Sequence, residues 1–181
     1  MAQTTPQVKI CGITGPDALQ AAVQGRARFA GFVFYPPSVR ALDLESARSL
    51  TAQVPTGMRA VGLLVDPEDD MLGDHIRMLH LDMIQLHGNE SPGRAAEIRA
   101  RFGIPVMKAL KIADESDLDH LPGYESACDW LLFDAATNPG DVPGGTGQSF
   151  NWTLLQDRDI ALPGMLAGGL YEDNIAQALE V

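Results

Sequence analysis

Short apolar runs alternate with amphipathic stretches along the whole chain. The apolar runs predict strands at seven places: 8–13, 29–34, 59–65, 83–87, 105–110, 130–134 and 165–167. The amphipathic stretches predict helices at 16–24, 44–53, 67–80, 92–102, 116–121, 151–156 and 172–180. Apolar strands that alternate with helices are typical of a parallel sheet with helical crossovers.

Residues with strong local preferences mark several of the helix ends. Pro16 suits the first position of a helix, and Gly25 suits the residue just past its end. Asp43 is a plausible N-cap for the second helix. Pro122-Gly123 is expected to interrupt the fifth helix, which is therefore predicted to be short and weak.

Two architectures fit this alternation, a closed barrel and an open doubly wound sheet. No G-x-G-x-x-G motif follows the first strand, which argues against the dinucleotide-binding form of the open sheet. The even spacing favours an α/β fold of the (β/α)8 TIM barrel class. That barrel has eight strands, and the sequence shows seven. We therefore expect one barrel domain over residues 1–181 that lacks its eighth β/α unit at the C-terminal end.

Composition narrows the function classes. The 181 residues suit one domain, and no apolar run reaches the length of a membrane span. Residues 1–7 do not resemble a secretory signal, so we expect a cytoplasmic protein. Its 2 cysteines predict no disulfide framework, and its 4 scattered histidines predict no metal site. A net charge of −11 argues against nucleic acid as a partner, but a phosphate can still be bound locally by backbone N–H groups.

Reactive side chains recur where the predicted strands end, which is the active-site end of such a barrel. Cys11 is either a small core residue or, beside Gly12, a base for proton abstraction. Asp134 ends an apolar run, so it is either a turn residue or a desolvated acid that can donate a proton. Arg40 is either a solvated loop residue or a partner for a carboxylate. His87 and Lys108 are not decisive from the sequence.

Two glycine-rich segments are candidate anion sites. Residues 138–147 form a long loop, which is either a plain linker or a lid over the substrate whose glycines, including Gly145 and Gly147, present backbone N–H groups. Gly168-Gly169 follows the seventh strand and is either an ordinary turn or part of a phosphate site.

Seven motifs together carry a resemblance to a known family. They are KICGIT at 9–14, GFVFY with SVR at 31–40, VGLLV at 61–65, QLHG at 85–88, LLFD at 131–134, GGTG at 144–147 and LAGGL at 166–170. In this order they span nearly the whole chain, and the sequence resembles the phosphoribosylanthranilate isomerases of tryptophan biosynthesis. The family's eighth-strand loop has no counterpart, and Tyr171 stands where a small polar residue is more usual.

The resemblance implies an acid–base Amadori rearrangement of a small phosphorylated substrate, without metal or cofactor. It assigns the acid to Asp134 and the base to Cys11. It assigns the substrate carboxylate to Arg40 and half of the phosphate site to Gly168 and Gly169. We also expect His87, Gly145 and Gly147 to bind substrate. We further expect a monomer or a homodimer, with no membrane or nucleic-acid partner.

Two other functions remain open. A related barrel, indole-glycerol-phosphate synthase, would need a lysine acid and a glutamate pair at strand ends, and only Lys108 is available. A degenerate barrel that acts as a scaffold would explain the missing eighth unit but not the retained acid, base and glycine loops.

Overall fold

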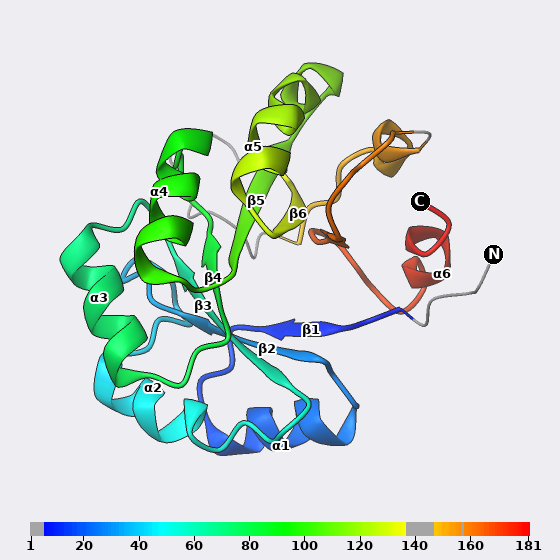
Figure 1. The fold of residues 1–181 in the computed structure, drawn as a ribbon. Helices are drawn as coiled ribbons and strands as arrows, with labels where there is room; N and C mark the ends of the chain where they lie inside the picture. The colour runs from blue at the N-terminus through cyan, green and yellow to red at the C-terminus, as the bar shows by residue number, and fades with distance from the viewer. Residues whose placement is uncertain (1–5, 137–146, 157) are drawn as a thin grey trace. The chain divides into compact units, whose positions relative to one another are not determined.

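The computed structural model describes residues 6–136, 147–156 and 158–181, and the chain divides into two compact units, Met1–Gln85 and Leu86–Val181. Within the described residues, strands alternate with helical segments from one end of the chain to the other (Figure 1). In the same residues, no helix is both long enough and apolar enough to cross a membrane.

The first unit is built from parallel strands joined by helices. Its elements are β1 (Lys9–Cys11), α1 (Pro16–Gln24), β2 (Phe29–Val33), α2 (Leu44–Thr51), β3 (Arg59–Leu64), α3 (Asp69–Met78) and most of β4 (Met83–Leu86). β2 pairs in parallel with both β1 and β3, so that Gly31 lies opposite Cys11 on one side and Val61 on the other. All five residues of β2 are buried, as expected for a strand covered on both faces.

The second unit repeats the same construction. Its elements are α4 (Pro92–Phe102), β5 (Val106–Ile112), η1 (Glu115–His120), α5 (Leu121–Ala127), β6 (Trp130–Ala135), η2 (Trp152–Leu155), β7 (Gly164–Leu166) and α6 (Ile175–Ala178). β6 pairs in parallel with β5 and β7, with Asp134 opposite Lys111 and Phe133 opposite Leu166. Leu110, Leu131 and Phe133 belong to one buried apolar cluster of this unit.

Several predicted helix ends are confirmed with their physical causes. α1 and α4 have the predicted bounds, each with a proline in the first turn. Asp43 caps α2, because its carboxylate accepts the Ser46 N–H at 2.8 Å. α4 ends at Gly103, whose φ of 63° lies in the left-handed region that glycine adopts without strain.

Other expectations were wrong. Pro122-Gly123 does not interrupt a helix, because Pro122 lies in the first turn of α5, where a missing N–H costs nothing. The predicted helix at 116–121 is instead the 3-10 helix η1, and the one at 151–156 is the 3-10 helix η2. The helix expected over 172–180 shrinks to α6, which covers only Ile175–Ala178.

Candidate active site

Cys11 is the last residue of β1 and is partly buried. Its thiol lies against Gly31, where an added Cβ would be only 3.0 Å from the Sγ atom. The N–H groups of Gly12 and Ile13 both donate to the Gly31 carbonyl, at 2.9 and 3.0 Å. The absence of a side chain at Gly31 therefore makes room for the thiol, and the neighbouring strand fixes the backbone that carries it.

Arg40 lies beside Cys11 in the first unit. Its Nη1 donates to the Cys11 carbonyl at 3.1 Å, across 29 residues of sequence. The side chain passes directly over Gly12, where a Cβ would stand 2.5 Å from the Arg40 Cδ. Gly12 also has a φ of 82°. The first unit thus brings together two predicted site residues, a thiol and a guanidinium.

Asp134 lies inside β6 rather than after it, and only 7% of the residue is exposed. Its Oδ1 accepts the N–H of Ala135 at 2.9 Å, and its Oδ2 lies 3.4 Å from Nε2 of His87. One oxygen of the Asp134 carboxyl therefore binds the local backbone, and the other faces the His87 imidazole.

His87 follows β4 directly and is 4% exposed. The structure brings it to Asp134, a pairing that the sequence did not indicate because the two residues are 47 positions apart. A direct hydrogen bond to the Asp134 carboxylate requires a proton on Nε2 of the imidazole. Binding of substrate by His87 stays a prediction.

The glycine pair after β7 lies tightly against Asp134. Gly168 and Gly169 have φ angles of 77° and 60°. A Cβ on Gly168 would be 2.7 Å from the Asp134 Oδ1, and one on Gly169 would be 2.6 Å from the Ser149 nitrogen. Only glycine fits this arrangement without moving the carboxyl or the neighbouring backbone.

Gly147, which ends the long loop, is held by Tyr171. The Tyr171 hydroxyl donates to the Gly147 carbonyl at 2.9 Å, and the Tyr171 N–H donates to the Asn174 Oδ1 at 2.7 Å. Asn174 is also the N-cap residue of α6, where its side chain makes no capping hydrogen bond. The predicted binding residue Gly145 lies outside the described residues.

Lys108 is the third residue of β5, not a residue near its end, and it is 2% exposed. Its Nζ lies 2.7 Å from the Glu90 carboxylate, whose side chain is equally buried. Lys108 pairs with Leu131 in register, so its side chain is on the face of the apolar cluster, opposite the face that carries Asp134. A lysine inside an apolar strand signals a buried partner, but the sequence does not say which acid it is.

The second cysteine, Cys128, is 2% exposed. Burial raises the pKa of its thiol to about 11, and the nearby Lys108 only partly opposes this shift. A thiol with that pKa is almost fully protonated at neutral pH. The raised pKa of Cys128 therefore argues against this thiol as the base.

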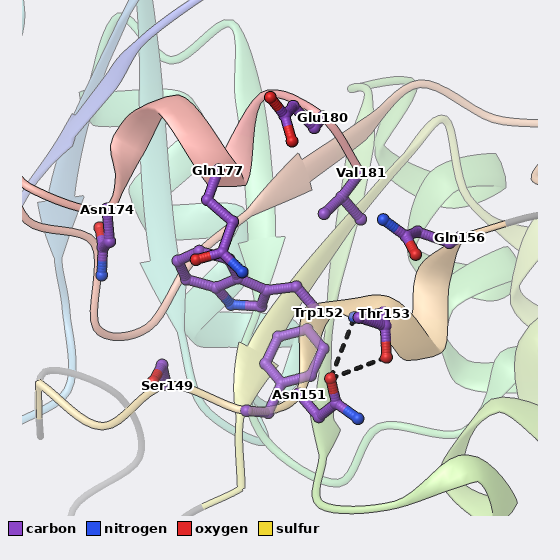
Figure 2. Close-up of a pocket in the computed structure, with 10 residues that line it drawn as sticks. Ser149, Asn151, Trp152, Thr153, Gln156, Asn174, Gln177, Glu180 and Val181 are labelled. Carbon is purple, nitrogen blue, oxygen red and sulfur yellow. Dashed lines mark hydrogen bonds between the residues drawn. The ribbon is translucent and has the colours of Figure 1, made fainter.

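A pocket of about 290 Å³ opens elsewhere in the second unit (Figure 2). Trp152, Asn174 and Gln177 are among its lining residues, and Asn151 accepts from both the N–H and the hydroxyl of Thr153 beside them. Among the described residues that line this pocket, none is a predicted site residue, and they form no acid–base pair.

Comparison with known proteins identifies relatives along almost the whole chain. Residues 8–181 match the family model of N-(5'-phosphoribosyl)anthranilate isomerase. An enzyme of that name from Rhodospirillum centenum is 55% identical over 175 residues, which cover 96% of this chain and 82% of the relative. The one from Paracoccus denitrificans is 48% identical over 176 residues, 96% of this chain and 81% of the relative.

Solved structures agree with the sequence relatives. Phosphoribosyl anthranilate isomerase from Thermotoga maritima superposes with a TM-score of 0.87 at 34% identity and covers 98% of this chain and 83% of its own. A second structure, with a TM-score of 0.84 at 31% identity, covers 98% of this chain and 82% of its own. It is a complex with reduced 1-(o-carboxyphenylamino)-1-deoxyribulose 5-phosphate. The predicted (β/α)8 barrel class is confirmed by these neighbours.

Proposed function

Because the chain belongs to the N-(5'-phosphoribosyl)anthranilate isomerase family, we propose that it isomerises N-(5-phosphoribosyl)anthranilate to 1-(2-carboxyphenylamino)-1-deoxyribulose 5-phosphate in tryptophan biosynthesis. The reaction is an aldose–ketose isomerisation of the Amadori type. The observation that carries the proposal is the family match, supported by a buried carboxyl in β6 and a partly buried thiol at the end of β1, the two kinds of group that the chemistry uses.

Asp134 is the proposed acid. In its protonated form it gives its proton to the furanose ring oxygen, while the lone pair of the substrate nitrogen forms a C1′ iminium and the C1′–O bond breaks. Only 7% of the residue is exposed, so bulk water has little access to this carboxyl. His87 Nε2, 3.4 Å from Oδ2, stabilises the carboxylate left after the transfer.

Cys11 is the proposed base. Its thiolate removes the C2′ proton, which is acidic because it lies next to the iminium. The electrons of the C–H bond form the C1′–C2′ double bond of an enolamine, and they neutralise the nitrogen. Protonation at C1′ and loss of the hydroxyl proton then give the C2′ ketone. The nitrogen of the substrate is itself the electron sink, so these reaction steps require no cofactor.

Arg40 is the proposed partner of the anthranilate carboxylate, since a guanidinium matches the two oxygens of a carboxylate. Its Nη1 bond to the Cys11 carbonyl is the support for placing the aromatic part of the substrate next to the base. Gly147, Gly168 and Gly169 are proposed for the phosphate, because backbone N–H groups of glycine-rich turns after the late strands of such a barrel can bind an anion. Gly145 joins this set from the sequence motif alone.

A specific observation counts against the synthase alternative. Its acid would have to be Lys108, yet the Lys108 ammonium is buried against Glu90 on the face of β5 opposite Asp134. It therefore cannot reach a substrate on the Asp134 side without breaking a buried ion pair.

The proposal is tested by incubating the purified chain with N-(5-phosphoribosyl)anthranilate and following the carbon-13 spectrum. We expect a ketone signal at C2′ with no change in mass. Unchanged substrate would contradict the proposal, and loss of carbon dioxide from added 1-(2-carboxyphenylamino)-1-deoxyribulose 5-phosphate would indicate the synthase. Asp134→Asn, which keeps the shape and removes the proton, is expected to lower kcat roughly 100-fold or more.

We further propose a cytoplasmic monomer or homodimer. A thiol base needs a reducing compartment to stay free, which supports the location. One structural neighbour is described as a dimeric enzyme that was converted to monomers. Light scattering of the purified chain distinguishes the two oligomeric states by mass.

A further inference from the structure

The second unit contains a buried ion pair that the proposed reaction does not use. Lys108 Nζ and Glu90 Oε2 are 2.7 Å apart, and each side chain is only 2% exposed. Lys108 comes from β5, whereas Glu90 comes from the segment between β4 and α4. The hydroxyl of Tyr124 in α5 also donates to the Glu90 carbonyl at 3.0 Å.

Both members of the pair bind the backbone around His87. The Glu90 carboxylate accepts the Gly88 N–H with both oxygens, at 3.1 and 3.0 Å. Lys108 Nζ donates to the Gly88 carbonyl at 2.8 Å and to the Leu86 carbonyl at 3.4 Å. The residues on either side of His87 are therefore held by one ammonium and one carboxylate.

We infer that Lys108 and Glu90 are positioning residues that fix the turn after β4, so that the His87 ring meets the Asp134 carboxyl at 3.4 Å. The inference rests on the proposed function, because Asp134 is the acid of that reaction. Neither charged group touches the substrate in this scheme. They act through the backbone of residues 86–88, because Lys108 is on the other face of the sheet.

The energetics favour a positioning role over simple stabilisation. Taking an ammonium and a carboxylate out of water costs several kcal/mol for each ion, and well-packed apolar residues of the same volume are often at least as stable. Apolar side chains could not, however, bind the N–H and the carbonyl of Gly88. A placement error of about 1 Å at a catalytic group can lower the rate roughly 100-fold, which is reason enough to retain the pair.

The test is the double variant Lys108→Met/Glu90→Gln, which removes both charges without leaving one unpaired. The expected result is a kcat lower by about 10- to 100-fold with KM changed less than about 3-fold. In the same variant, the ring signals of His87 in a histidine-labelled NMR sample are expected to shift or broaden before any substrate is added. If the pair only stabilised the fold, the folded double variant would keep its kcat and its KM, and the His87 ring signals would not shift.

The matched control is Arg158→Met/Glu115→Gln, which removes an exposed ion pair of the same unit and should leave both readouts unchanged. Unchanged kcat, or a lower kcat with unmoved His87 signals, would overturn the inference. If the double variant does not fold, Glu90→Asp, which keeps the charge opposite Lys108 but shortens the reach to the Gly88 N–H, gives the same two readouts. Failure of the wild type to turn over the substrate would instead overturn the proposed function, and the His87 signals would still decide the inference.

Discussion

At the residue scale, the proposed acid and base have different surroundings that suit their different tasks. Asp134 is buried in a strand, with one oxygen on its own backbone and the other toward an imidazole. Cys11 is at a strand end, partly buried and next to a guanidinium. The sequence could indicate the two residues, because Asp134 ends an apolar run and Cys11 lies in the first predicted strand, directly before a glycine. It could not indicate the His87 contact or the Lys108–Glu90 pair, which depend on residues distant in sequence.

Replacing Cys11 with alanine removes the proposed base and little else, since the thiol lies over a glycine. We expect kcat to fall roughly 100-fold or more while the circular dichroism spectrum is retained. The matched control is Cys128→Ala, which removes the other thiol and should keep near-normal turnover. Equal activity of the two variants would remove Cys11 from the mechanism.

Arg40→Ala removes the proposed partner of the substrate carboxylate. We expect KM for the carboxylated substrate to rise about 10-fold or more, as loss of a charge-assisted pair implies, with a smaller effect on kcat. Arg77→Ala on α3, which removes an exposed helix-surface cation of the same unit, should leave KM unchanged. A flat KM in Arg40→Ala would rule out the carboxylate assignment.

At the element scale, helix ends with proline, glycine or a capping side chain could be predicted from sequence to the residue, as α1 and α4 demonstrate. α5 could not, because Pro122 and Gly123 were interpreted as an interruption when Pro122 occupies a first turn. The difference between η1 and an α-helix depends on how the chain packs after β5, which no local pattern encodes.

The turn after β7 has room only for glycine at positions 168 and 169. Gly168→Ala would place a methyl group 2.7 Å from the Asp134 Oδ1 at a φ of 77°. We expect a loss of about 1–3 kcal/mol in the free energy of unfolding and a kcat lowered together with a raised KM. Urea unfolding and steady-state kinetics measure both. Gly93→Ala in α4, where an added Cβ meets nothing closer than 3.8 Å, is the control.

At the scale of the whole molecule, the strand–helix alternation was enough to predict the barrel class, because parallel strands joined by helices admit few architectures. The two compact units, Met1–Gln85 and Leu86–Val181, were not predicted. The pattern of apolar and polar residues predicts individual strands and helices. The division into compact units depends instead on which strands and helices pack on one another.

Global stability should respond to alkaline pH through Cys128. Its thiol pKa is raised from 9.0 to about 11 in the folded chain, so below pH 9 the thiol is protonated in both states and its contribution to stability is complete. Above pH 9 the unfolded chain loses this proton first, so the contribution is lost as the pH rises toward 11. Urea unfolding between pH 7 and 10.5 should show a decline that is shallower in Cys128→Ala. Identical slopes would contradict the shift.

The alternation of side chains in β1 has a consequence for how this chain can evolve. Lys9 and Cys11 both lie against Gly31, on one surface of the sheet. Loss or gain of a single codon within this strand would turn the thiol toward the opposite surface, and a thiol would return only if a cysteine also arose at the adjacent position. Length variation among descendants of this gene should therefore accumulate in the connecting segments and be purged from the three residues of β1.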